Sequence, residues 1–401
     1  MNFISLKSID DPSQTRPNSE PNPARFFWQL LTPTEILTCR AVCTRWFNLF
    51  SDAKVWQPIV SKYSFVDAID PLIQSDPCTA FIRNQRKISN IHNVRFKKSE
   101  YLTKSQLNAD TKYIYHLTTW NSELLVHYYL QGDNEQHRRT LFHADKSFEE
   151  IKADPWKLGN IKSINGKLIA AAEIKQIGEK TTNASRKFIV ELSTQTDPKI
   201  IYDEKSTITF LPLLDKILIA ELKDFETYFE TYLTIIKTDG TLIISKQIEF
   251  YDVTTINDKI IIRIQEKLTI LDQNLNEIAT TNSNQYLGGN LQGFDSTLIF
   301  DYYYKFPLHQ KKCKWATFSD IFEFNRLNTS EYSLSDPNKL YDRVICFDGP
   351  EADSSKIRFS HINDFVFDQY IDHPYARCMT VIGSKIFVAS ADTITLYDFD
   401  V

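Results

Sequence analysis

The chain has 401 residues, of which 42% are hydrophobic, so it is long enough to bury a sizeable core. Its formal net charge of −5 provides no positive field to neutralise phosphates, which argues against nucleic acid as a partner. The six cysteines lack C-x-x-C spacing, and their scatter is typical of the reduced thiols of a cytoplasmic protein.

The first segment, residues 1–22, is rich in Pro, Ser, Asn and Asp. It contains no apolar run that could act as a secretion signal or a membrane span, so no membrane association is expected. Such a composition cannot bury enough apolar surface to fold alone. We therefore predict a disordered tail over residues 1–22.

In residues 23–62 the apolar positions recur at helical spacing. Thr32 is suited to be the N-cap of a helix, because Pro33 follows it and Glu35 can reach back in a capping box. Leu31 and Ile36 occupy the positions of a hydrophobic staple. Further apolar residues spaced three or four apart predict one stripe, which comprises Ile36, Cys39, Val42, Cys43, Trp46, Leu49 and Phe50.

The runs Leu30–Pro33, Glu35–Leu37 and Val42–Trp46, followed by Trp56, resemble the F-box. In that family the helices bind the Skp adaptor and, through it, the cullin of a Skp-cullin-F-box ubiquitin ligase. A Leu-Pro pair that usually precedes these runs is absent here. The resemblance implies nine adaptor-binding residues: Leu30, Leu31, Pro33, Ile36, Leu37, Val42, Cys43, Trp46 and Trp56.

Residues 63–98 contain a second helical pattern, which Asp76 and Pro77 are suited to begin. The pattern resembles the linker helix that many F-box proteins place between the box and a propeller. We therefore predict a linker helix within this range.

The remaining residues, 99–401, repeat one form, in which a polar turn and a charged residue precede an apolar strand. Taking the first residues of these strands as equivalent gives steps of 44, 49, 43, 38 and 88 residues, the last being a double step. The positions are Glu123, Lys167, Lys216, Lys259, Thr297 and Lys385. A period near 44 residues is typical of propeller blades with four antiparallel strands.

The end of the chain, residues 390–398, resembles the end of a WD-type repeat, with Tyr397 in the usual Trp position. We therefore predict a mainly β protein with a small N-terminal α domain, whose 99–401 region is a WD-like β-propeller with seven blades, or alternatively six. The last blade lacks its outer strand, and we expect residues 94–102 to supply it.

The sequence contains no recognisable metal-binding, cofactor-binding or catalytic motif. Gly288–Gly293 lacks the Lys and the setting of a phosphate loop, and no H-E-x-x-H or G-x-S-x-G sequence occurs. Because some propellers are glycoside hydrolases that use two carboxylates, the acidic residues of several turns are candidate catalytic groups: Asp215, Asp258, Asp295 and Asp301. Asp is common in turns for its local hydrogen bonds, so a turn role is preferred.

An insertion, residues 302–315, combines aromatic and cationic side chains, which favours contact with a protein partner. A solvated loop is the alternative interpretation. The candidate substrate-binding residues are Tyr302, Tyr303, Tyr304, Lys311, Lys312, Lys314 and Trp315.

The resemblance to the F-box, together with the predicted propeller, implies the substrate-recognition adaptor of a Skp-cullin-F-box ubiquitin ligase. The protein would not be an enzyme, and its propeller would hold a protein substrate of unknown identity. A propeller scaffold without a ligase role and a propeller glycoside hydrolase are the alternatives. The Ile, Lys and Asn usage is also compatible with a bacterial effector that acts in the cytosol of a host.

Overall fold

The computed structural model divides the chain into two compact units, Met1–His92 with Asp400 and Asn93–Phe399 with Val401. None of the described helices combines the length and apolar character needed to cross a membrane. The predicted tail and Leu30 lie outside the described residues. The structure describes residues 31–401 apart from 68–69, 109, 132–136, 153–155, 175–185, 205–206, 226–227, 266, 283–290, 295–296, 303–311, 318–327, 331–334, 348–355, 362–366 and 392.

The first unit is helical, as expected, and its first helix begins at the predicted cap. The Glu35 N–H donates to Thr32 Oγ1 (3.3 Å), and the Thr32 N–H donates to Glu35 Oε2 (2.7 Å), which completes the capping box. The helices are α1 (Pro33–Arg40), α2 (Thr44–Leu49), α3 (Ala53–Val60), α4 (Leu72–Ser75) and α5 (Pro77–His92).

Helix α5 begins at Pro77, as predicted, and the Asp76 carboxylate accepts the Thr79 N–H (3.1 Å). Its side chains Cys78 and Phe81 belong to the same hydrophobic cluster as Trp56 of α3. The helix therefore completes the core of the helical unit.

The second unit consists of seven four-stranded antiparallel sheets formed by the described residues, together with the short helix α6 (Lys104–Leu107). Six of these sheets are each formed by four strands that are consecutive in the chain. The first three are β2 (Thr111–Trp120), β3 (Glu123–Leu130), β4 (His137–Phe142) and β5 (Phe148–Glu150); β6 (Lys157–Ile164), β7 (Lys167–Ile174), β8 (Arg186–Leu192) and β9 (Lys199–Glu204); and β10 (Thr207–Leu213), β11 (Lys216–Phe225), β12 (Tyr228–Lys237) and β13 (Leu242–Gln247). The next three are β14 (Asp252–Ile256), β15 (Lys259–Ile264), β16 (Lys267–Leu271) and β17 (Glu277–Asn282); β18 (Leu291–Phe294), β19 (Thr297–Tyr302), β20 (Lys312–Thr317) and β21 (Asn328–Ser330); and β22 (Ser335–Leu340), β23 (Arg343–Phe347), β24 (Lys356–His361) and β25 (Phe367–Asp372).

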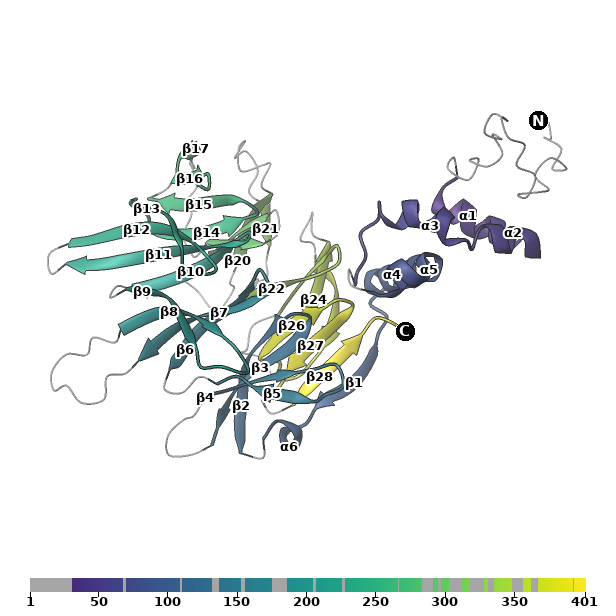
Figure 1. Cartoon of the computed structure of the whole chain (residues 1–401), viewed down its shortest axis with the longest axis horizontal. Coiled ribbons are helices and arrows are strands. Elements are labelled where there is room, and N and C mark those ends of the chain that lie inside the picture. The colour runs from purple at the N-terminus through teal and green to yellow at the C-terminus, as the bar shows by residue number, and fades with distance from the viewer. Residues whose placement is uncertain are drawn as a thin grey trace. The chain divides into compact units, whose positions relative to one another are not determined.

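The seventh sheet joins residues from both ends of this unit. Its order is β1 (Lys97–Leu102), β28 (Ile394–Asp398), β27 (Lys385–Ala389) and β26 (Cys378–Ile382), so β1 is the outer strand. Lys97 lies opposite Asp398 in the antiparallel register, and Figure 1 shows blue β1 beside yellow β28. This confirms the prediction that residues 94–102 supply the missing strand.

The repeat found in the sequence corresponds to one hairpin of each sheet. All six anchor residues, from Glu123 to Lys385, are the first residue of the second strand of a sheet. The two-residue turns before the five anchors other than Thr297 contain backbone with positive φ, as at Asn165 (50°) and Gly166 (73°). Asn and Gly adopt this conformation at low energetic cost, so turns that contain them can be recognised in the sequence.

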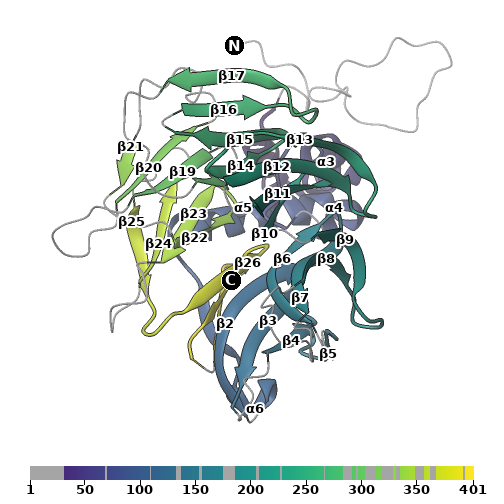
Figure 2. The same ribbon diagram turned by 90° about the vertical axis from the view of Figure 1, so that its left-hand side faces the viewer.

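The first strands of the sheets line the centre of the unit. Figure 2 shows the sheets following one another around this centre. Strand β2 contacts β26 and β6, β10 contacts β6 and β14, β14 contacts β18, and β22 contacts β26. The arrangement is therefore propeller-like, as expected from the sequence.

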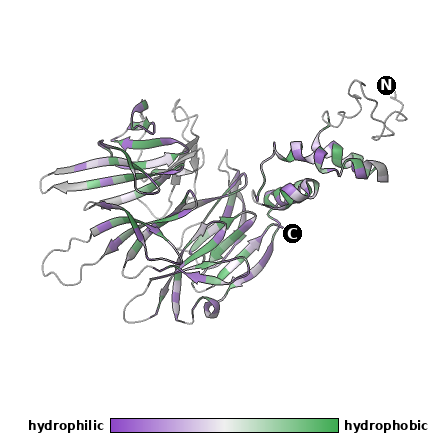
Figure 3. Cartoon of the chain, viewed as in Figure 1, coloured by the Kyte–Doolittle hydropathy of each residue, from purple (hydrophilic) through white to green (hydrophobic). Residues whose placement is uncertain are grey.

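Apolar residues of neighbouring sheets form the core between them. Hydrophobic and hydrophilic residues alternate along many strands (Figure 3). One cluster, for example, joins Leu125 and Leu141 of one sheet to Leu158 and Phe188 of the next. Burial of these facing surfaces supplies the main driving force for stacking the sheets.

Candidate functional site

The helical unit has a core of its own. The Trp56 side chain has no exposed surface, and its indole N–H donates to the carbonyl of Phe50 (2.6 Å). Its ring lies 5.2 Å from that of Phe81, and Ile36 is equally buried in the same cluster. A few short helices thus bury a compact apolar centre.

Several apolar side chains between residues 42 and 49 remain outside this core. Val42 is 63% exposed, Phe47 49% and Leu49 41%, and Cys43 is also exposed. We call Val42, Cys43, Phe47 and Leu49 the α1–α2 patch. Exposed apolar groups concentrated in one short segment are typical of a surface that a partner covers.

Arg40 stiffens one side of the α1–α2 patch. Its guanidinium lies 4.8 Å from the centre of the Phe47 ring, and one of its N–H groups donates to Cys78 Sγ (2.7 Å). Burial raises the pKa of the Cys78 thiol, while the nearby Arg40 acts in the opposite direction. Because Cys78 belongs to the core, Arg40 links Phe47 to the interior of the unit.

The predicted adaptor-binding residues divide into exposed, half-buried and buried groups. Val42 and Cys43 are exposed, whereas Leu31, Pro33, Leu37 and Trp46 are half-buried. Ile36 and Trp56 are wholly buried, and a side chain without exposed surface cannot contact a partner directly. The assignment of Ile36 and Trp56 as binding residues is therefore corrected, since they form the core that supports the surface.

The single stripe predicted through residues 36–50 is also wrong. Helix α1 ends at Arg40, and Cys43 has extended backbone (φ −161°, ψ 166°) before α2 begins. The break resets the helical phase, so Phe50 is buried while Leu49 is exposed. The apolar spacing did not identify Phe47 as an exposed residue, because its exposure follows only when α2 is treated as a separate helix.

The predicted substrate-binding insertion is shorter than expected. Tyr302 ends β19, and Lys312 begins β20, where the two residues lie opposite each other in the register. Lys314 and Trp315 are likewise strand residues, because the sequence 312–317 pairs with β19. Tyr303, Tyr304 and Lys311 lie outside the described residues.

The described part of the chain contains no cluster of metal-ligating side chains. No group of three or more His, Cys, Asp or Glu side chains there could hold a metal ion. Cys39 and Cys43, which are four residues apart in the sequence, are free thiols, one half-buried and the other exposed.

Comparison with solved structures finds propellers at low similarity. The β-propeller domain of the Trilobed protease from Pyrococcus furiosus has a TM-score of 0.46 and 11% identity, covering 72% of this chain and 94% of that one. The Neurospora crassa Pan2 WD40 domain has a TM-score of 0.44 and 8% identity, and the match covers 75% of this chain and 95% of that one. Pyrococcus horikoshii acylaminoacyl peptidase has a TM-score of 0.47 and 9% identity. The match covers 73% of this chain and 52% of that one, which is about half of that protein. No protein-family model and no curated protein sequence matches the chain.

The expectation that the protein is not an enzyme is corrected by these comparisons. Of the three structures above, one is the β-propeller domain of a protease and another is a peptidase. The sheet arrangement therefore gives no ground for excluding an enzyme. At such TM-scores the likeness assigns no activity to this chain either.

Proposed function

We propose that this chain is the substrate-recognition adaptor of a Skp-cullin-F-box ubiquitin ligase. The helical unit would bind the Skp adaptor through the α1–α2 patch, and the propeller would bind a protein substrate. Holding the two together raises the effective concentration of the substrate near the conjugating enzyme.

The observation that carries the proposal is the exposure of Val42, Phe47 and Leu49 beside a closed core. These residues are not needed to fill the interior, which Trp56, Phe50 and their neighbours already occupy. Covering them with a partner removes apolar surface from water at about 25 cal/mol per Å². The resemblance of residues 30–56 to the F-box supplies the identity of that partner.

The test is a titration of the purified chain against a purified Skp adaptor. Val42→Asp and Phe47→Asp each introduce a charge at an exposed position, so they should weaken binding at least about tenfold without unfolding the unit. Leu242→Asp is the matched control, because this residue of β13 is 59% exposed in the other unit. Circular dichroism of each variant verifies that the helices remain.

Failure of the wild-type chain to bind the Skp adaptor would contradict the proposal and favour a scaffold role. Binding that is equally strong in both patch variants would show that another surface is used. Substrate binding is tested by affinity purification from eukaryotic cells followed by mass spectrometry. Both the wild-type chain and Val42→Asp should recover substrates. The Skp adaptor should be recovered with the wild type only.

A further inference from the structure

The propeller unit contains a pocket that the proposed adaptor role does not use. It has a volume of about 260 Å³ and is lined by β6, β7 and β8 of one sheet and by β10 of the next. Gly159, Ala171 and Ala172 contribute small residues to its wall, and Phe188 and Phe210 contribute aromatic ones. A pocket below the range of about 300–1,000 Å³ that holds drug-sized ligands fits a smaller molecule.

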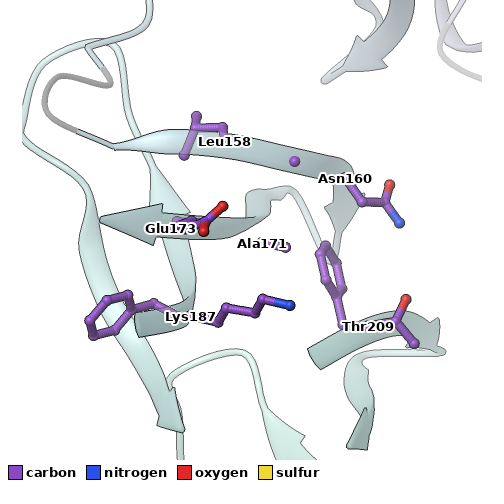
Figure 4. Close-up of a pocket in the computed structure, with 10 residues that line it drawn as sticks. Leu158, Asn160, Ala171, Glu173, Lys187 and Thr209 are labelled. Atoms are coloured by element: carbon purple, nitrogen blue, oxygen red, sulfur yellow. The ribbon is translucent and has the colours of Figure 1, made fainter. Parts of the chain in front are cut away.

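Four polar side chains from four different strands also line this pocket. They are Asn160 of β6, Glu173 of β7, Lys187 of β8 and Thr209 of β10. Figure 4 shows the Lys187 side chain extending toward the side of the pocket where Thr209 lies. A few polar groups that converge on a small apolar wall are the usual means of orienting a bound molecule.

Glu173 and Lys187 lie directly opposite each other in the antiparallel register of β7 and β8. Opposite charges in this position commonly form a cross-strand pair. Among the described side chains, however, neither Glu173 nor Lys187 has an ion pair or a hydrogen bond; the side chain of Glu204, opposite Lys187 in the register of β8 and β9, lies outside the described part. Farther along the same two strands, Lys167 and Glu191 do pair, with Nζ and Oε2 3.0 Å apart.

The juxtaposition of one anion and one cation restricts the kind of ligand that fits. A ligand with a single charge is attracted by Glu173 or Lys187 and repelled by the other, so the two contributions oppose each other. A ligand that carries a cation and an anion on neighbouring atoms can pair with both. The free α-amino acid is the smallest common molecule of this chemistry, with an ammonium and a carboxylate on one carbon.

We propose that this pocket binds a free α-amino acid with an aliphatic side chain. Its ammonium would pair with Glu173 and its carboxylate with Lys187, while Asn160 and Thr209 supply further hydrogen bonds. The side chain would lie against Ala171, Ala172 and the adjacent aromatic wall. The proposal does not rest on the ubiquitin-ligase role.

The first test uses L-leucine and the unmodified full chain. A ligand that binds only the folded state raises the Tm with concentration, so leucine should increase the Tm progressively. Leucine amide lacks the carboxylate, and N-acetyl-leucine lacks the ammonium. Each should bind at least about tenfold more weakly, since each leaves one charged partner unsatisfied.

The second test changes the protein. Lys187→Met and Glu173→Gln should each weaken leucine binding about tenfold, as measured by calorimetric titration. Lys167→Met is the matched control on the same strand pair, and it should leave binding unchanged. The Tm of each variant without ligand separates loss of binding from loss of folding.

Two results would overturn the proposal. The first is no response to leucine, valine or alanine at their highest soluble concentrations. The second is equal binding of N-acetyl-leucine amide, which carries neither charge, because the pocket would then recognise peptide-like groups instead of a free amino acid.

Discussion

The indole N–H of Trp56 donates to the backbone carbonyl of Phe50 across 2.6 Å in the buried centre of the helical unit. Phe50 ends the α1–α2 segment, and Trp56 lies in α3, so this bond fixes the connection between them. A rigid connection holds the α1–α2 patch in one conformation before any partner arrives, which lowers the entropic cost of binding.

Replacing this indole should destabilise the helical unit. Trp56→Phe removes the indole N–H that donates to the Phe50 carbonyl and creates a void, so the unfolding free energy should fall by about 1–3 kcal/mol. Trp46→Phe, at a half-buried position, should cost less. Urea unfolding followed by the helical circular dichroism signal gives both values, and a larger loss for Trp46→Phe would contradict this assignment.

A glycine in β18 allows two neighbouring sheets to approach closely. The Gly293 N–H donates to Thr254 Oγ1 (2.7 Å), and a Cβ at this position would lie 2.1 Å from the carbonyl oxygen of Thr255. Gly293→Ala should therefore lower the unfolding free energy by about 1–3 kcal/mol.

Gly159→Ala is the control for this substitution, because its nearest contact would be an ordinary 3.7 Å. It should stay within about 1 kcal/mol of the wild type in the same thermal or urea unfolding experiment. Similar losses in the two variants would show that the close approach at Gly293 is not the cause.

The outer position of β1 predicts an unequal effect of two neighbouring prolines. Ser99 and Glu100 lie opposite Leu396 and Thr395 of β28, and successive N–H groups of a strand point to opposite sides. Only one of Ser99→Pro and Glu100→Pro therefore removes a bond to β28, at a cost of at least about 1 kcal/mol. Hydrogen exchange in residues 394–398 should increase in that variant alone, and unchanged exchange in both would contradict the pairing.

His373 makes the stability of the propeller depend on pH. Its Nδ1 lies 2.6 Å from the Tyr397 hydroxyl, and burial lowers its pKa from 6.5 to about 4, with Lys98 adding to the effect. Between these values the unfolded chain binds a proton that the folded chain does not. The unfolding free energy should consequently fall as the pH decreases from about 6.5 to about 4.

His373→Asn retains a polar side chain and removes the titration. Its unfolding free energy should change less steeply over this pH range than that of the wild type. The buried His127, whose pKa is also lowered, is present in both proteins and cancels from the difference. Identical slopes would show that His373 is not responsible.

The parts of the fold that the sequence predicted are those fixed by local chemistry. The capping box of Thr32 and Glu35 spans one helical turn, and the hairpins before Lys167 and Lys259 are two-residue turns, so short segments determine both. Local sequence does not determine which side chains are buried between segments that lie far apart in the chain. Whether Trp56 faces a partner or the core depends on α5, which lies about 20 residues farther along the chain.

The candidate sites were harder to predict for the same reason. The α1–α2 patch depends on a break in the helix at Cys43, which the periodicity of the apolar residues concealed. The pocket depends on the register of β7 and β8, which places Glu173 opposite Lys187, and on β10 from the next sheet. Neither residue stands out in the sequence, because isolated charges in strands are common.

Hydrogen exchange of the chain with and without a purified Skp adaptor tests the central proposal most directly. We predict that the adaptor slows exchange in residues 41–50, where the α1–α2 patch lies, and leaves residues 242–247 of the propeller unchanged. Unchanged exchange in residues 41–50 at saturating adaptor would contradict the proposed function.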